Sequence, residues 1–371
     1  MNLKIWVMAL ATTFLFSYFA EASDICGRIP QIVTEIEHEV KKPCKDITSS
    51  DLATIKIMHL EKAGLSQLSE DSFEGLTGVE RIILNTNQIT ALPPKIFKNL
   101  PSIQLIDLTN NKLASIPDDL FSGIVTLKAI SLQSNQLTSI SSKVFRDLKS
   151  IQIILIAYNN LTEVPEDLFW GLNSITRLSI SHTQISVLPE KLFKGLSSLQ
   201  QLELTANLFT SVPEKVFNGL TSLKILDLYG NQITDLPEKV FKGLNSLSGV
   251  SIPQNKLTSL PEKLFQGLPN LNLILLSKNP LGSLPENIFN GLKSLQTVVM
   301  EETGLRVLPE RLFSGLISLE SIYLNDNLLN ILPPKLFDGL SSLQLVALSG
   351  NNFSATEKTR LQAQLGDKVS F

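Results

Sequence analysis

Residues that could carry out chemistry are few and scattered in this sequence. The histidines are His38, His59 and His182, and no repeat unit brings two of them together. Nucleophilic catalysis and metal binding both need several such groups converging in one pocket. Ser181 and His182 would make part of a hydrolase only with an acidic residue from a neighbouring coil, so we interpret His182 as a surface residue. The sequence therefore predicts no catalytic residue, no metal site, no cofactor and no enzymatic activity.

The first residues have the pattern of a secretory signal. Lys4 precedes an apolar run, and Ala20–Ala22 forms an A-x-A cleavage site. We predict a signal peptide over residues 1–22, a mature chain that begins at Ser23, and no membrane span after cleavage. An uncleaved anchor is the alternative, although the apolar run is short for a span. The predicted localisation is secreted, either extracellular or on the cell surface.

The cysteines are Cys26 and Cys44. Because export places a chain in an oxidising compartment, we predict a disulfide between them, with two free thiols as the alternative. No second pair or histidine cluster accompanies them, which argues against a metal site. Asn160 and Asn352 begin glycosylation sequons, which matter only in a eukaryotic secretory pathway.

From Ile55 onward the sequence repeats every 24 residues without insertion or deletion. Each unit reads L-x-x-L-x-L-x-x-N-x-L-x-x-L-P-x-x-x-F-x-x-L-x-x. The L-x-L portion alternates with period two, as a half-buried strand does, and turn residues follow it. Stacked coils are expected to place these strands side by side in a parallel sheet. The thirteen units begin at Ile55, Val79, Ile103, Leu127, Ile151, Ile175, Leu199, Leu223, Leu247, Leu271, Leu295, Leu319 and Leu343.

Two other positions of the unit have a structural interpretation. Asn occupies the ninth position in most units, where its amide is expected to satisfy backbone groups left open at the strand end. Thr183 and Thr303 replace this Asn and are expected to keep part of the bonding, whereas Ala63 has no group for it. Phe at position nineteen is expected to fill the convex half of the core.

The repeated unit resembles the leucine-rich repeats of the 24-residue "typical" extracellular class. Similar units occur in secreted bacterial leucine-rich repeat proteins, in Toll-like receptors and in variable lymphocyte receptors. The resemblance implies an α/β solenoid, a right-handed horseshoe with a parallel concave sheet and an irregular or short-helical convex side. We expect twelve repeats over residues 55–342, and the thirteenth repeat with a C-terminal cap over residues 343–371.

Both ends of such an array need caps, because the first and last coils otherwise expose core. Residues 23–54 are predicted to form the N-terminal cap, stapled by the two cysteines. It includes a short helix whose apolar face comprises Ile32, Val33, Ile36 and Val40.

A second short helix is predicted at the C-terminal end. Ser354 and Glu357 resemble a capping box, Leu361 and Leu365 form one apolar stripe, and Gly366 is a plausible stop. The last residues are predicted to form a final strand.

Function is expected on the concave face, where side chains vary while the scaffold repeats. Aromatic and aliphatic anchors with a charged border are typical of protein interfaces. We predict a secreted protein that binds another protein, with a structural or adhesive component that recognises glycan or cell wall as the alternative. The predicted binding residues are Ile153, Leu155, Tyr158, Arg177, His182, Glu203, Asp227, Tyr229, Leu273, Leu275, Val299 and Tyr323.

Charge argues against nucleic acid as the partner. The formal net charge is −3, and basic and acidic residues are nearly balanced on the predicted concave face, with acid concentrated toward the C-terminal end. A nucleic-acid-binding face is normally basic. Glu-Lys pairs on the outer turns, such as Glu190–Lys191 and Glu262–Lys263, are interpreted as a solvated back face.

Overall fold

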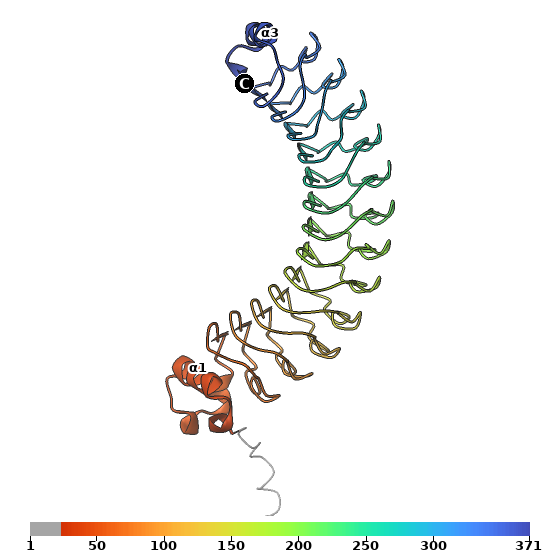
Figure 1. Cartoon of the computed structure of the whole chain (residues 1–371). Coiled ribbons are helices and arrows are strands. Elements are labelled where there is room, and N and C mark those ends of the chain that lie inside the picture. Colours follow the sequence, from red (N-terminus) through yellow and green to blue (C-terminus); the bar gives the residue numbers. More distant parts are fainter. Residues whose placement is uncertain (1–23) are drawn as a thin grey trace, which may run out of the picture.

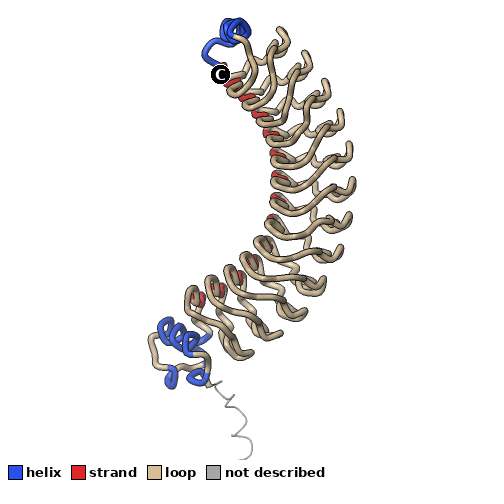
Figure 2. Tube along the Cα trace, in the orientation of Figure 1, coloured by secondary structure: helices blue, strands red, loops and turns tan. Residues whose placement is uncertain are grey.

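The computed structural model describes residues 24–371, so the signal peptide predicted over residues 1–22 lies outside the described residues. The described chain winds into one curved solenoid with helix α1 at one end and α3 at the other (Figure 1). The strands line the inner edge of the arc, and loops and turns make up its outer side (Figure 2). The predicted horseshoe with a parallel concave sheet and an irregular convex side is confirmed.

The helices and strands are short, as expected from a coil of 24 residues. In residues 24–371 the helices are η1 Ile25–Gly27, α1 Pro30–Val40, η2 Cys44–Asp46, α2 Ser49–Leu52, α3 Ala355–Leu365 and η3 Gly366–Lys368. The strands are β1 Ile57–His59, β2 Arg81–Ile83, β3 Leu105–Asp107, β4 Ala129–Ser131, β5 Ile153–Leu155, β6 Arg177–Ser179, β7 Gln201–Glu203, β8 Ile225–Asp227, β9 Gly249–Ser251, β10 Leu273–Leu275, β11 Thr297–Val299, β12 Ser321–Tyr323, β13 Leu345–Ala347 and β14 Val369–Ser370.

The strands form one parallel sheet in chain order from β1 to β14. From β1 to β13, every strand residue pairs with the residue one repeat further on, as Ile57 does with Arg81. The middle residue of each of these strands is buried, and its neighbours point to the opposite, concave side. Residues three and five of every repeat are therefore displayed side by side along the arc.

The curvature follows from the residues that fill the two halves of the core. Phe rings of successive repeats stack from Phe73 to Phe169 and from Phe193 to Phe313, with centroids 5.8 to 6.4 Å apart. Adjacent strands lie only about 4.8 Å apart. Because the aromatic side of each coil is thicker than the strand side, the stack bends with the sheet on the inside.

The chain leaves each strand with backbone N–H and C=O groups that need hydrogen-bond partners inside the stack. The side chain of the Asn at position nine supplies these partners, and we call the row of such residues the Asn ladder. Asn135 donates to the carbonyls of Leu108, 2.9 Å away in the preceding coil, and of Leu132 at 3.1 Å. Its oxygen accepts from the N–H of Leu113 at 3.1 Å. The expected pairing of backbone groups is confirmed.

The two threonines that replace Asn keep part of this network. The Thr303 hydroxyl donates to the carbonyl of Met300 at 3.0 Å or to the Asn327 side chain at 2.9 Å. The Thr183 hydroxyl donates to the Asn207 side chain. Threonine thus links neighbouring coils, although it lacks the second donor of an amide.

At the N-terminal end α1 packs against the first coil, where Ile32 and Ile36 join the same buried core as Met58 of β1. Cys26 and Cys44 form a disulfide with their Cα atoms 5.3 Å apart, which confirms the predicted pairing. Helix α1 buries Ile32 and Ile36 completely, whereas Val33 and Val40 are only half-buried. The packed face of α1 is therefore narrower than the four-residue stripe expected from the sequence.

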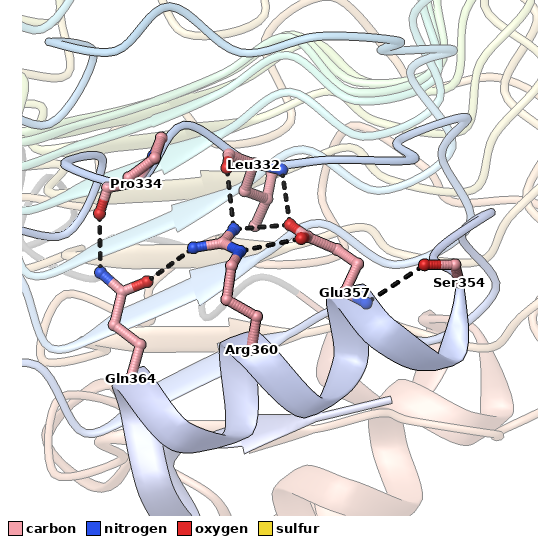
Figure 3. Close-up of polar contacts among 6 residues, drawn as sticks. All are labelled: Leu332, Pro334, Ser354, Glu357, Arg360 and Gln364. Carbon is pink, nitrogen blue, oxygen red and sulfur yellow. Dashed lines mark hydrogen bonds and ion pairs between the residues drawn. The ribbon is translucent and has the colours of Figure 1, made fainter.

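The C-terminal cap departs from prediction in one detail. Ser354 Oγ accepts a hydrogen bond from the N–H of Glu357 at 3.1 Å, which forms half of the expected capping box. The Glu357 carboxylate does not return to Ser354: it accepts from the N–H of Leu332 at 3.0 Å and from the Arg360 guanidinium (Figure 3). The reciprocal half of the predicted capping box is wrong, because Glu357 is used to dock α3 onto repeat 12.

Two further side chains extend this docking network. Arg360 donates to the carbonyl of Leu332 at 2.8 Å, and Gln364 donates to the carbonyl of Pro334 at 2.9 Å (Figure 3). The Arg360 guanidinium also donates to Gln364 Oε1 at 3.2 Å. Leu361 and Leu365 are buried, α3 ends at Gly366, and β14 closes the sheet, as predicted.

Candidate binding surface on the concave sheet

The structure places all twelve predicted binding residues on the concave side and none in the core. Each is exposed or half-buried. Nine lie on strands at positions three or five of their repeats, and Tyr158, His182 and Tyr229 lie in the loop just after the strand. The surface divides into a group in repeats 5 to 8 and a group in repeats 10 to 12.

The loop position that carries Tyr158 and His182 has a left-handed backbone. Their φ angles are 58° and 53°, and the equivalent residue of every repeat also has positive φ. The N–H of Tyr158 donates to the carbonyl of Ser181 in the next coil at 2.9 Å, and the N–H of His182 donates to the carbonyl of Thr205 at 2.8 Å. Coil-to-coil bonding thus holds a conformation that non-glycine residues seldom adopt.

This backbone brings the two rings together. Tyr158 and His182 stack with their centroids 4.1 Å apart and an interplanar angle of 10°. Although its ring is stacked on His182, Tyr158 is 53% exposed. The result is a flat aromatic platform whose position is set by the scaffold.

Ordered polar side chains border this platform. Arg177 forms an ion pair with Glu203 at 2.9 Å, and Gln201 donates to the same carboxylate at 2.7 Å. Asp227 accepts a hydrogen bond from the N–H of Tyr229 at 3.0 Å. Both carboxylates are therefore oriented before any partner arrives.

The second group lies on β10 to β12. Strand pairing places Leu275 beside Val299, and Val299 beside Tyr323. Leu273 lies on the same face of β10, two residues before Leu275. All four side chains are half-buried, so this group is a continuous apolar strip rather than a set of protruding anchors.

An acidic edge follows that strip. Glu302 pairs with Lys278 at 3.4 Å, and Glu301 accepts from the Asn325 side chain at 2.6 Å. Asp326, at the equivalent loop position of the next repeat, is exposed.

One exposed residue of β8, at the end of the first group, was not among the predicted binding residues. Ile225 is 40% exposed on β8, and its side chain lies against Gly249 of β9, where an added Cβ would be 3.1 Å from Ile225 Cδ1. The sequence does contain a signal for this exposed side chain: Ile225 and Gly249 occupy the same position of adjacent repeats, so a large residue lies beside a small one.

Metal-binding potential lies elsewhere. In residues 24–371, the one group of three close side chains suited to a metal is Glu35, His38 and Glu39 on α1. Burial raises the pKa of Glu35, whose carboxylate already accepts from the N–H of His59 at 2.8 Å. No helix in this part of the chain is long and apolar enough to cross a membrane.

Sheet, Asn ladder and caps together define a leucine-rich repeat solenoid. The model for the BspA-type leucine-rich repeat region matches in six copies, with residues 50–175, 115–248 and 162–280, and a second leucine-rich repeat model matches residues 293–353. The chain belongs to the BspA-type leucine-rich repeat family. A comparison with curated protein sequences found no significant match.

Solved structures agree with this assignment. A leucine-rich repeat protein of Leptospira interrogans is 30% identical, with a TM-score of 0.73, over 83% of this chain and 76% of that one. An internalin of Listeria monocytogenes is 21% identical, with a TM-score of 0.75, over 96% of this chain and 99% of that one. Toll in the Drosophila Toll–Spätzle complex is similar in fold, with 21% identity and a TM-score of 0.76, over 82% of this chain and 43% of that one.

Proposed function

We propose that this chain is a secreted, non-enzymatic protein that binds another protein through its concave sheet. In this proposal residues 1–22 are a signal peptide, residues 23–54 the N-terminal cap, residues 55–342 twelve repeats, and residues 343–371 the last repeat and cap. The Cys26–Cys44 disulfide supports exposure to an oxidising compartment.

The observation that carries the proposal is the aromatic platform of Tyr158 and His182. Large, rigid aromatic side chains are enriched among the residues that dominate binding energy. Because the left-handed backbone and the stack already fix the two rings, a partner that covers them would lose less conformational entropy. The Arg177–Glu203 ion pair adjoins the platform as a polar border.

The similar structures support the same class of function. Toll was solved in a complex with Spätzle, and another similar structure is the LRIM1/APL1C complex. Proposed ligand contacts in this chain are its own twelve concave residues, to which Ile225 is added. A partner would place apolar groups over repeats 5 to 8 and basic groups near the acidic edge.

The test is a variant that removes three concave aromatic side chains, Tyr158→Ala, Tyr229→Ala and Tyr323→Ala. We expect it to lose capture of protein partners from the native extracellular medium, detected by mass spectrometry, because the anchors are removed. The thermal transition should shift little, because these side chains lie outside the core.

The matched control is Trp170→Ala, which removes an aromatic side chain that is 55% exposed on the outer side. It should retain full capture. Unaltered capture by the triple variant would contradict the concave-face proposal. A signal on a glycan array without any protein partner would instead support the adhesive alternative.

A further inference from the structure

The outer turns of the array contain a cleft between repeats 6 and 7, which we call cleft 6/7. Its volume is about 460 Å³. The charged residues that line it are Glu190, Lys191, Lys194 and Lys215. Three lysines and one glutamate give it a formal charge of +2.

A second cleft, between repeats 8 and 9, has the same charged residues at the same repeat positions. Cleft 8/9 has a volume of about 530 Å³ and is lined by Glu238, Lys239, Lys242 and Lys263. Both clefts therefore place two lysines of one coil opposite a third lysine of the next coil.

The neighbouring cleft 9/10 shows that this charge is local. It has a volume of about 290 Å³ and is lined by Glu262 and Lys263, while Gln266 and Asn287 occupy the positions of the other two lysines. Its charged lining is neutral. The lysine clefts are thus a feature of repeats 6 to 9 and not of the whole outer side, and the chain as a whole has a net charge of −3.

These lysines are available to a ligand. Lys191 pairs with Glu166 of the preceding coil at 3.4 Å. Within residues 24–371, the other five lysines form no ion pair within 4.0 Å. All six are exposed, so the fold does not depend on burying their side chains.

The two clefts are also spaced along one line. Phe193, Phe217 and Phe241 stack beneath them at successive steps of 6.3 and 6.4 Å, so the clefts lie about 13 Å apart along the array. A linear chain with several anionic groups can follow the outer arc and occupy both clefts at once. Linking two weak sites in this way raises the overall affinity well above that of either one.

We propose that clefts 6/7 and 8/9 together bind a linear sulfated polysaccharide. Lysine ammonium groups act as point charges that suit anionic oxygens without demanding one fixed geometry. No aromatic side chain lines either cleft, so single-stranded nucleic acid would find no stacking surface. The apolar lining residues, Val216 and Leu264, are buried, which leaves nothing to insert into a membrane.

Chromatography on immobilised heparin, with neutral dextran as the control matrix, tests the proposal. The wild-type chain should be retained on heparin at low salt and elute earlier as ionic strength rises, because exposed charge interactions are screened. A variant with Lys194→Gln, Lys215→Gln, Lys239→Gln and Lys263→Gln should bind heparin on the order of tenfold or more weakly. Its thermal transition should be unchanged.

Lys112→Gln, at an exposed lysine of repeat 3 outside both clefts, is the matched control and should keep wild-type retention. The concave triple-tyrosine variant should also keep it, since the two surfaces lie on opposite sides of the array. No retention of the wild type on heparin would overturn the proposal, as would an equal loss in the Lys112 control. Tighter binding of a single-stranded oligonucleotide through the same lysines would overturn the assignment to polysaccharide.

Discussion

At the scale of single residues, the Asn ladder decides how well neighbouring coils are joined. Asn135 is 7% exposed, and its side chain bonds four backbone groups across two coils, those of Leu108, Leu113, Leu132 and Gln133. A hydrophobic residue at this position would leave the N–H of Leu113 buried and unpaired. It would also remove one of the two side-chain donors to the carbonyls of Leu108 and Leu132, which keep Asn111 and Asn159. A buried group left unpaired costs more than the net worth of one hydrogen bond.

Asn135→Ala should therefore lower the free energy of unfolding by about 1 to 3 kcal/mol. Asn135→Thr should fall between wild type and Ala, because Thr183 and Thr303 keep part of the bonding at the same position. Thermal unfolding followed by circular dichroism measures both. Gln136→Ala removes an exposed amide one residue away and should have little effect; an equal loss in that variant would show that the ladder bonds are not responsible.

The same scale marks the limit of sequence prediction. The roles of Leu, Phe and Asn could be predicted because each recurs with the step of 24. For Tyr158 and His182 the sequence predicts only that they lie near each other, not that their rings stack. The left-handed backbone that orients both rings occurs at a repeat position held by Lys, Thr, Ser and Tyr in different repeats, so the residue type there does not reveal it. The lysine clefts were missed for a related reason: Glu-Lys pairs look like any solvated surface until the adjacent coil supplies the third lysine.

At the scale of elements, the caps combine predictable and unpredictable contacts. The helical spacing of Leu361 and Leu365 gave the position of α3, since an apolar stripe must face the last coil. The partner of Glu357 could not be inferred, because it lies 25 residues away, at the backbone of Leu332. Such long-range side-chain to backbone bonds follow from docking geometry and not from local sequence.

Acid should loosen this cap. Hydrogen bonds from Arg360 lower the pKa of the Glu357 carboxyl below its ordinary value of 4.5. A carboxyl whose folded pKa is lowered contributes stability that is fully present above the unfolded pKa and is lost as the pH falls through the folded pKa. Hydrogen exchange of α3 amides should therefore accelerate as the pH falls below about 4.5, after correction for the intrinsic rate.

Glu357→Gln should remove most of this pH dependence, because glutamine does not titrate. Arg360→Ala should destabilise the cap at neutral pH by about 1 to 3 kcal/mol, since it leaves the buried carboxylate with fewer donors. A protection profile of α3 in Glu357→Gln that still follows the wild-type pH curve would mean that other carboxyls control the cap.

At the scale of the whole molecule, each coil contacts chiefly its neighbours, so stability is a sum of local terms along one dimension. The parallel sheet runs unbroken through all thirteen coils, and the Phe stack accompanies most of it. This continuity makes the array a rigid arc that separates its concave face from the clefts on its outer side. Because each coil contacts chiefly its neighbours, local unfolding at one end should affect amide protection less and less in coils further along the array.

Reduction of the Cys26–Cys44 disulfide tests how far such damage spreads. The bond joins residues 18 apart and holds η1 and η2 together beside α1. A disulfide that closes a loop of this length stabilises the folded state by about 3 kcal/mol. Under a reductant, amide protection should fall in the N-terminal cap and in β1 and β2, whereas β9 to β13 should keep their oxidised values. The Cys26→Ser, Cys44→Ser variant should reproduce this profile without reductant. A uniform loss of protection from β1 to β14 would show instead that the array unfolds as one cooperative unit, because coupling between coils would then outweigh the independent stability of each coil.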